Sequence, residues 1–217
     1  MEQRPVWLFD LDNTLHDANP HIFPHINRSM TAYLREHLAV DEATANALRM
    51  GYWKRYGATL LGLMRHHGTN PHHFLQETHR FPDLASMMVF PRALAGLLGR
   101  LPGRKIVFSN GPQAYVETVV GLMGIRRHFQ DVFGVEQMGF HPKPQMRAYR
   151  SLLHAHRLNP RRCILVEDSA ENLRTAKRLG MTTVWVSRSL RQPAHVDYKI
   201  SSVLALGRSL GHPMVKP

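Results

Sequence analysis

The chain has 217 residues, of which 43% are hydrophobic and 20% are charged, and its formal net charge is +12. This composition suits one sizeable core, or a core with a small inserted domain, and excludes a largely disordered chain. A single cysteine, Cys163, excludes an internal disulfide framework. Without a signal-peptide pattern or an apolar run of about 18 residues, we expect a cytoplasmic protein with no membrane partner.

The first predicted element is a buried strand at residues 5–10, a short apolar run that ends on Asp10. Residues 20–80 then show apolar residues at helical spacing, with Asn, Gly and Pro punctuation and no strand pattern. Their capping signals predict four helices, at residues 21–38, 41–57, 58–68 and 70–79. We therefore predict an inserted all-α cap domain at residues 17–88.

From residue 91 onward, helical and strand patterns alternate along the chain. Strands are predicted at residues 104–110, 130–137, 162–168 and 182–188, and helices at residues 91–101, 111–124, 143–158 and 169–180. The last segment, residues 198–210, is predicted as a short strand followed by a helix. Such alternation implies right-handed crossovers and a parallel sheet. The predicted fold class is therefore α/β, with a Rossmann-like parallel sheet core at residues 1–16 and 89–217 and helices on both faces.

Polar side chains follow three of the predicted strands, at the point where each strand ends. These residues are Asp10 and Asp12, Ser109 and Asn110, and Glu167 and Asp168. Because the carboxyl ends of parallel strands open on one crevice, we expect these side chains to converge there. The carboxylates of Asp10, Asp12 and Asp168 would repel one another, and oxygen ligands of this kind favour Mg²⁺. Asp12 could contribute its main-chain carbonyl instead, and a turn-forming role for each aspartate alone stays open.

The two aspartates that follow the first strand suit a divided role in phosphoryl transfer. A metal-bound carboxylate can attack phosphorus, which makes Asp10 the candidate nucleophile. Asp12 is the candidate acid and base, since the leaving alcohol needs a proton and the attacking water must lose one. Ser109 and Asn110 either cradle a phosphate or cap the next helix. Lys143, between two prolines, either neutralises a phosphoryl group or is a solvated surface lysine.

Four motifs occur in a fixed order: DLDNT at residues 10–14, FSNG at 108–111, HPKP at 141–144, and VEDS at 166–169 followed by ENLRTAKRLGM. Together they resemble the haloacid dehalogenase-like (HAD) hydrolase superfamily, which is dominated by Mg²⁺-dependent phosphatases. The resemblance implies a Rossmann-like core with a helical cap inserted just after the first motif.

The same resemblance implies roles for the motif residues. Asp10 would be the nucleophile and Asp12 the acid and base, while Ser109 and Lys143 would bind the phosphate. Asp168 would be a metal ligand with Glu167 close by. Because the dehalogenases that name the group lack the second aspartate, the presence of Asp12 argues against dehalogenation.

Residues 51–74 also resemble the cap of the pyrimidine 5′-nucleotidase subgroup, in which an aromatic-rich stretch precedes the sequence HHG. His16 departs from that subgroup, where a tyrosine is common at this position. The candidate substrate-selectivity residues are Tyr52, Tyr56, Arg55 and His66, which could contact the base, the ribose or the phosphate of a nucleotide. The alternative is that Tyr52 and Tyr56, four residues apart, form one packed helix face.

The sequence therefore predicts a Mg²⁺-dependent phosphatase that hydrolyses a nucleoside 5′-monophosphate, preferably a pyrimidine one, through an aspartyl-phosphate intermediate. One alternative is a phosphatase or phosphomutase acting on another small phosphoester, such as phosphoglycolate or a sugar phosphate. A second alternative is a non-catalytic, basic nucleic-acid-binding protein. We expect a small phosphorylated metabolite as the partner rather than a nucleic acid, and the oligomeric state stays open.

Overall fold

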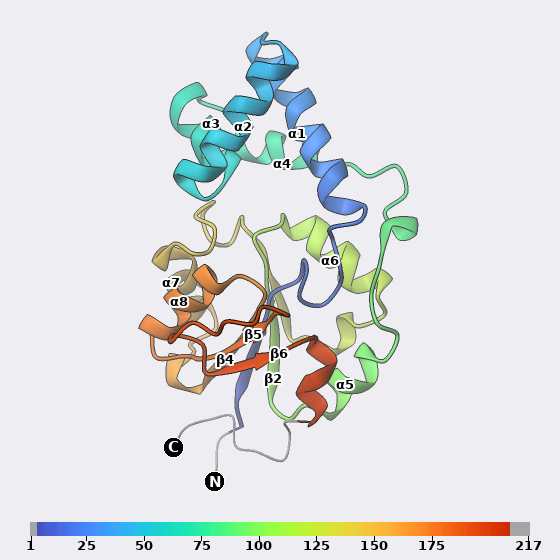
Figure 1. Ribbon diagram of the computed structural model, residues 1–217, viewed down its shortest axis with the longest axis vertical. Coiled ribbons are helices and arrows are strands. Elements are labelled where there is room, and N and C mark those ends of the chain that lie inside the picture. The colour runs from blue at the N-terminus through green and yellow to red at the C-terminus, as the bar shows by residue number, and fades with distance from the viewer. Residues whose placement is uncertain (1–3, 209–217) are drawn as a thin grey trace.

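Six parallel strands form one sheet in the order β3-β2-β1-β4-β5-β6, in a computed structural model that describes residues 4–208 (Figure 1). The strands are β1 (Val6–Phe9), β2 (Arg104–Phe108), β3 (Asp131–Phe133), β4 (Cys163–Glu167), β5 (Thr182–Val186) and β6 (Tyr198–Ile200). The first strand, β1, pairs with both β2 and β4, so the chain order reverses at the centre of the sheet. The predicted Rossmann-like α/β fold is confirmed.

Both faces of the sheet are covered by helices, as the apolar runs of its strands predict. The covering helices are α5 (Leu94–Arg100), α6 (Gln113–Leu122), α7 (Met146–Ala155) and α8 (Ala170–Arg178). Successive side chains of β1 point to opposite faces: Trp7 and Phe9 join one apolar cluster, and Val6 and Leu8 join the other. Figure 1 shows α7 and α8 on one side of the sheet and α5 and α6 on the other.

Four further helices gather beyond one end of the sheet (Figure 1). They are α1 (Ile22–Leu38), α2 (Glu42–Tyr56), α3 (Thr59–His67) and α4 (Pro71–Thr78). The predicted caps form: the Asp41 side chain accepts a hydrogen bond from the N–H of Thr44, and Asn70 accepts from His72 and His73. These helices share an apolar cluster that includes Leu34, Leu63 and Phe74. No helix within residues 4–208 is long and apolar enough to cross a membrane.

The chain returns from α4 to the sheet through residues 79–93, which include the short 3₁₀ helix η1 (Ala85–Met87). Phe81, Leu84 and Phe90 of this segment pack against the cluster that contains Trp7. The helical part of the insertion therefore ends before the predicted boundary at residue 88. The division into a core of residues 1–16 and 89–217 and a cap of residues 17–88 stays our proposal, with the end of the proposed cap packed against the core.

Three predicted elements differ in the structure. The strand predicted at residues 130–137 ends at Phe133, because the N–H of Gly134 bonds to side-chain oxygens of Gln113 and Gln137 instead of extending the ladder. The helix predicted at residues 143–158 begins only at Met146, beyond a proline that disfavours helical backbone before it. The last predicted helix is instead a 3₁₀ helix, η4 (Val203–Arg208), and residues 209–210 lie outside the described residues.

Two further short 3₁₀ helices that the sequence did not predict are η2 (Arg126–His128) and η3 (Pro160–Arg162). The helix η3 ends directly before β4, and two residues separate η2 from β3, so both lie at the end of the sheet away from the polar strand ends. They leave the predicted order of strands and helices unchanged.

Candidate active site

The carboxyl ends of β1, β2 and β4 bring the predicted polar residues together. Asp10 follows β1, and its N–H donates to the carbonyl of Val166 at 3.0 Å. Ser109 follows β2, and Glu167 is the last residue of β4, directly before Asp168. The parallel register of these central strands therefore places three motifs that are far apart in the sequence at one edge of the sheet.

Lys143 lies among these strand ends and is only 2% exposed. Its Nζ donates to Asp10 Oδ1 at 2.7 Å, to Glu167 Oε2 at 2.8 Å and to the carbonyl of Phe108 at 2.6 Å. These bonds use all three donors of an ammonium group. Lys143 is therefore a buried partner of the two carboxylates and not a solvated surface lysine.

Asn110 fixes the backbone of Lys143 from both sides. Its Oδ1 accepts from the N–H of Lys143 at 2.8 Å, and its Nδ2 donates to the carbonyl of Lys143 at 3.0 Å. Ser109, which is 1% exposed, accepts from the N–H of Gly111 at 3.0 Å. Neither side chain caps α6, so the alternative reading as helix caps is wrong for both residues.

Asp10, Glu167 and Asp168 bring carboxylate oxygens within 4.8 Å of one another. Burial, and then the charge of Glu167, raise the pKa of Asp10 to about 7, although Lys143 opposes the shift. Burial likewise raises the pKa of Glu167 to about 7, and burial followed by Asp10 raises that of Asp168. Burial lowers the pKa of Lys143, but the two carboxylates outweigh this effect and hold it above its usual value.

Three carboxylates thus face one ammonium, and the pKa values of the acids are raised by burial and then by mutual repulsion. A divalent cation with oxygen ligands supplies further positive charge, and Mg²⁺ prefers carboxylates of this kind. The donor set at the strand ends therefore fits Mg²⁺.

Asp12 has a different environment from Asp10. Its Oδ1 accepts a hydrogen bond from the Tyr115 hydroxyl at 2.6 Å and lies 2.9 Å from His16 Nε2. Its carboxylate does not belong to the acidic cluster of Asp10, Glu167 and Asp168. Asn13, with a φ of 63°, turns the chain between these residues and Thr14, whose hydroxyl donates to Asp10 Oδ2 at 3.1 Å.

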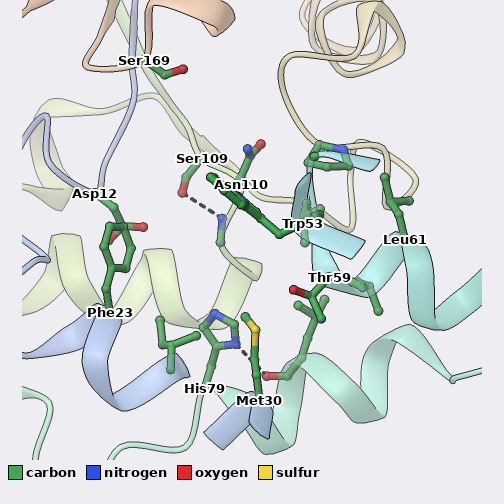
Figure 2. Close-up of a pocket in the computed structure, with 18 of the residues that line it drawn as sticks. Asp12, Phe23, Met30, Trp53, Thr59, Leu61, His79, Ser109, Asn110 and Ser169 are labelled. Carbon is green, nitrogen blue, oxygen red and sulfur yellow. Dashed lines mark hydrogen bonds between the residues drawn. The ribbon is translucent and has the colours of Figure 1, made fainter. Parts of the chain in front are cut away.

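A cavity of about 530 Å³ lies between the strand ends and the four cap helices. On the core side its lining includes Asp10, Asp12, Ser109, Asn110, Glu167 and Asp168. On the cap side its lining includes Phe23, Met30, Arg49, Trp53, Leu61 and His79. Figure 2 shows Asp12, Ser109 and Asn110 facing this group of mostly apolar cap side chains. The polar strand ends thus open on an enclosure with a largely apolar far wall.

The candidate selectivity residues Tyr52, Tyr56, Arg55 and His66 do not line this cavity. The hydroxyl of Tyr56 bonds to His66 Nε2 at 2.7 Å, and the Tyr52 ring stacks on His66 with centroids 5.5 Å apart. Arg55 lies over the Tyr56 ring at 5.4 Å. These side chains join α2 to α3, which favours the packed-face interpretation, and their role in selectivity stays a prediction.

The sequence analysis missed several residues that the structure brings to the site. Tyr115 and His16 bond to Asp12, while Arg49 and His79 line the cavity. Burial lowers the pKa of His79 to about 4, so its imidazole is neutral at physiological pH. Only His16 carried a sequence signal, its four-residue spacing from Asp12. The others reach the site through tertiary packing, which leaves no local pattern.

Comparison with known proteins agrees with this geometry. A family model described as haloacid dehalogenase-like hydrolase matches residues 6–180, which include all four motifs. The chain belongs to this hydrolase family. The resemblance inferred from the motifs is therefore confirmed at the level of the HAD hydrolases.

Two relatives of this HAD hydrolase are phosphoglycolate phosphatases. The one from Rhodospirillum rubrum is 28% identical over 193 residues, covering 83% of this chain and 78% of the relative. The one from Mesorhizobium japonicum is 25% identical over 218 residues, covering 93% and 91%. A HAD phosphatase from Thermococcus onnurineus shares the fold, with a TM-score of 0.68, 18% identity and coverage of 96% and 98%.

The cofactor follows from the family and the acidic cluster together. The HAD hydrolase YfnB from Bacillus subtilis, bound to magnesium, aligns with a TM-score of 0.64 and 17% identity over 96% of this chain and 99% of its own. The buried carboxylates of this chain form an oxygen donor set of the kind that Mg²⁺ prefers. Mg²⁺ is the cofactor of this HAD hydrolase.

Proposed function

We propose that the chain is a Mg²⁺-dependent phosphatase that hydrolyses a small phosphomonoester through an aspartyl phosphate on Asp10. One observation carries the proposal: the Asp10 carboxylate lies at the cavity, held by Lys143 and Thr14, beside two further carboxylates. A carboxylate held rigidly on a strand end suits attack on a bound phosphorus atom.

In the first step, a carboxylate oxygen of Asp10 forms a bond to phosphorus while the ester bond to the leaving oxygen breaks. Asp12 gives its carboxyl proton to that oxygen, so the alcohol leaves neutral. Lys143 keeps Asp10 in place, and Ser109 and Asn110 at the cavity wall are the proposed phosphate contacts. Asp10, Asp168 and the Asp12 main-chain carbonyl would hold Mg²⁺, which would supply positive charge against the phosphoryl oxygens.

In the second step, Asp12 takes a proton from a water molecule, whose oxygen bonds to phosphorus. The bond between phosphorus and Asp10 breaks, which releases inorganic phosphate and restores the Asp10 carboxylate. The apolar cap wall keeps other water away from the site. Both steps use the same two aspartates, and Asp12 ends the cycle protonated, as it began.

The cavity supports two substrate candidates. Its volume lies within the range of about 300–1,000 Å³ typical of small-molecule sites, and Phe23 and Trp53 offer aromatic surface on the cap side. This wall favours a bulky planar group, as in a pyrimidine nucleoside 5′-monophosphate. Phosphoglycolate is the second candidate, because both relatives act on it and Arg49 offers a cation for its carboxylate.

Phosphate release from a panel of phosphorylated metabolites, with and without Mg²⁺, tests the function. The panel contains UMP, CMP, phosphoglycolate and sugar phosphates, and the Asp10→Asn variant is the matched control. We expect Mg²⁺-dependent release by the wild type and none by the variant. Undiminished turnover by Asp10→Asn would overturn the mechanism, and a rearranged sugar phosphate without phosphate release would identify a phosphomutase.

The nucleic-acid-binding alternative draws on the net charge of +12 alone. It requires tight binding that weakens steeply with salt, as several phosphate contacts would produce. If nucleic-acid binding vanishes at modest salt and the protein releases phosphate in the metabolite panel, the result supports the phosphatase.

A further inference from the structure

We propose that Tyr115 is a positioning residue that holds Asp12 in the orientation its acid and base steps require, with His16 as its partner. The inference rests on the proposed function, in which Asp12 transfers the protons. Tyr115 belongs to α6 and His16 to the loop after β1, so two separate parts of the core converge on one carboxylate.

Both hydrogen bonds fall on the same oxygen of Asp12. The Tyr115 hydroxyl donates to Oδ1 at 2.6 Å, and His16 Nε2 lies 2.9 Å from that atom. The other oxygen, Oδ2, has no hydrogen bond to any residue in the described range 4–208. Asp12 lines the cavity, so Oδ2 is the atom available to exchange a proton with a substrate or water.

The two partners are themselves held in place. Tyr115 is 4% exposed and His16 is 3% exposed, so neither side chain has room to rotate. A Cβ on Gly111 would lie only 2.9 Å from the Tyr115 ring, which shows how closely the backbone of the FSNG motif approaches it. Tyr115 therefore packs between Gly111 of the FSNG motif and Asp12 of the DLDNT motif.

The Tyr115 ring also contacts the segment that returns from the cap. Its centroid lies 5.6 Å from that of Phe81, in a stacked arrangement, and 5.5 Å from that of His79. His79 ends α4 and lines the cavity (Figure 2). The orientation of Asp12 therefore depends on a ring that packs against the cap segment. Asp12 is held in its catalytic orientation while Phe81 and His79 of that segment contact Tyr115.

The chemistry gives Tyr115 a signature that a purely structural residue lacks. An alkyl leaving group needs the proton of Asp12, whereas p-nitrophenolate leaves without one. Since kcat/KM covers the steps up to breakage of the ester bond, misplacing Asp12 should lower kcat/KM for an alkyl phosphomonoester selectively. A general loss of packing would lower both values together.

Steady-state kinetics of Tyr115→Phe with the best alkyl phosphomonoester of the panel and with p-nitrophenyl phosphate test the inference. The variant keeps the ring and removes only the hydroxyl. We expect kcat/KM to fall about 10- to 100-fold for the alkyl ester, as for loss of a hydrogen bond to a charged group, and by less than about threefold for p-nitrophenyl phosphate. Tyr33→Phe is the matched control, because it removes a hydroxyl that bonds to His73 at 3.0 Å, away from the cavity.

A second variant, His16→Leu, keeps the test decisive if Tyr115→Phe does not fold, and the same selective loss is expected for it. Equal losses for both esters, or no loss for the alkyl ester, would overturn the inference. Acid-quenched wild-type protein separates this failure from failure of the proposed function. If the wild type carries a phosphoryl group but kcat/KM of Tyr115→Phe is unchanged, only the role of Tyr115 is overturned. If the wild type is active but never carries a phosphoryl group, the proposed function is overturned.

Discussion

The ammonium of Lys143 holds the buried carboxylates of Asp10 and Glu167 at 2.7 and 2.8 Å. Removing it leaves two acids buried without their cation, which costs about 3–5 kcal/mol. We expect Lys143→Met to lower the free energy of unfolding by that amount and to abolish phosphate release. Urea denaturation of the metal-free protein measures the first effect.

Lys177→Met is the control for this loss. Lys177 also pairs with a carboxylate, that of Asp197, but its side chain is 34% exposed. Because Lys177 keeps contact with water, removing it should cost less than removing the fully buried Lys143. Equal losses for the two lysine variants would contradict the view that burial makes the Lys143 pair special.

The raised pKa values of Asp10 and Glu167, each about 7, predict how stability depends on pH in the metal-free protein. The folded state keeps protons that the unfolded chain releases near its usual values of 3.8 and 4.5. Their contribution to stability is therefore full below about pH 4 and is lost as the pH rises towards 7. We expect Tm to fall over this range, and to fall less in the Asp10→Asn, Glu167→Gln double variant.

Mg²⁺ should reverse this loss, because it binds the ionised carboxylates and competes with protons. We expect a larger rise in Tm on adding Mg²⁺ at about pH 8 than at about pH 5. Thermal unfolding at both pH values measures the difference. Identical pH profiles for the wild type and the double variant would contradict the assigned pKa shifts.

At the scale of secondary-structure elements, Gly62 permits the close approach of α2 and α3. A Cβ at this position would overlap the Tyr52 ring. We expect Gly62→Ala to destabilise the protein by about 1–3 kcal/mol, as overpacking does, even though alanine favours a helix. Gly51→Ala is the control, since a Cβ there meets no atom within 4 Å. Similar unfolding free energies for the two variants would show that α2 and α3 can separate at little cost.

The sequence predicted the strands well where an apolar run ends in a polar pair, because such strands are buried on both faces. It overran the end of β3, since Val135 continues the apolar alternation beyond Phe133, where the strand ends. The Val135 side chain belongs to the cap cluster instead. An apolar residue looks the same in sequence whether its partner is a neighbouring strand or another domain.

The same limit explains which site residues were predicted. Asp10 and Asp168 directly follow strands, so topology alone brings them together. Tyr115 reaches Asp12 across 103 residues of chain, from the first turn of α6. The Tyr52 stretch carries a subgroup resemblance, yet its aromatic rings lie between helices and not in the cavity.

At the scale of the whole molecule, the core supplies the chemistry and the cap supplies most of the apolar cavity wall. Arg49 lines the cavity, whereas Arg55 of the same helix does not. We expect Arg49→Gln to raise KM about tenfold for an anionic substrate such as phosphoglycolate, with kcat little changed. A larger effect from Arg55→Gln would instead support the selectivity role that the sequence predicted for Arg55.

The covalent intermediate is the central claim, and its location is directly measurable. Wild-type protein is mixed with Mg²⁺ and the best substrate of the panel, quenched in acid within one turnover, and mapped by peptide mass spectrometry. The expected result is a phosphoryl group on Asp10, absent from Asp10→Asn. Full activity with a phosphoryl group on another residue, or on none, would contradict the account.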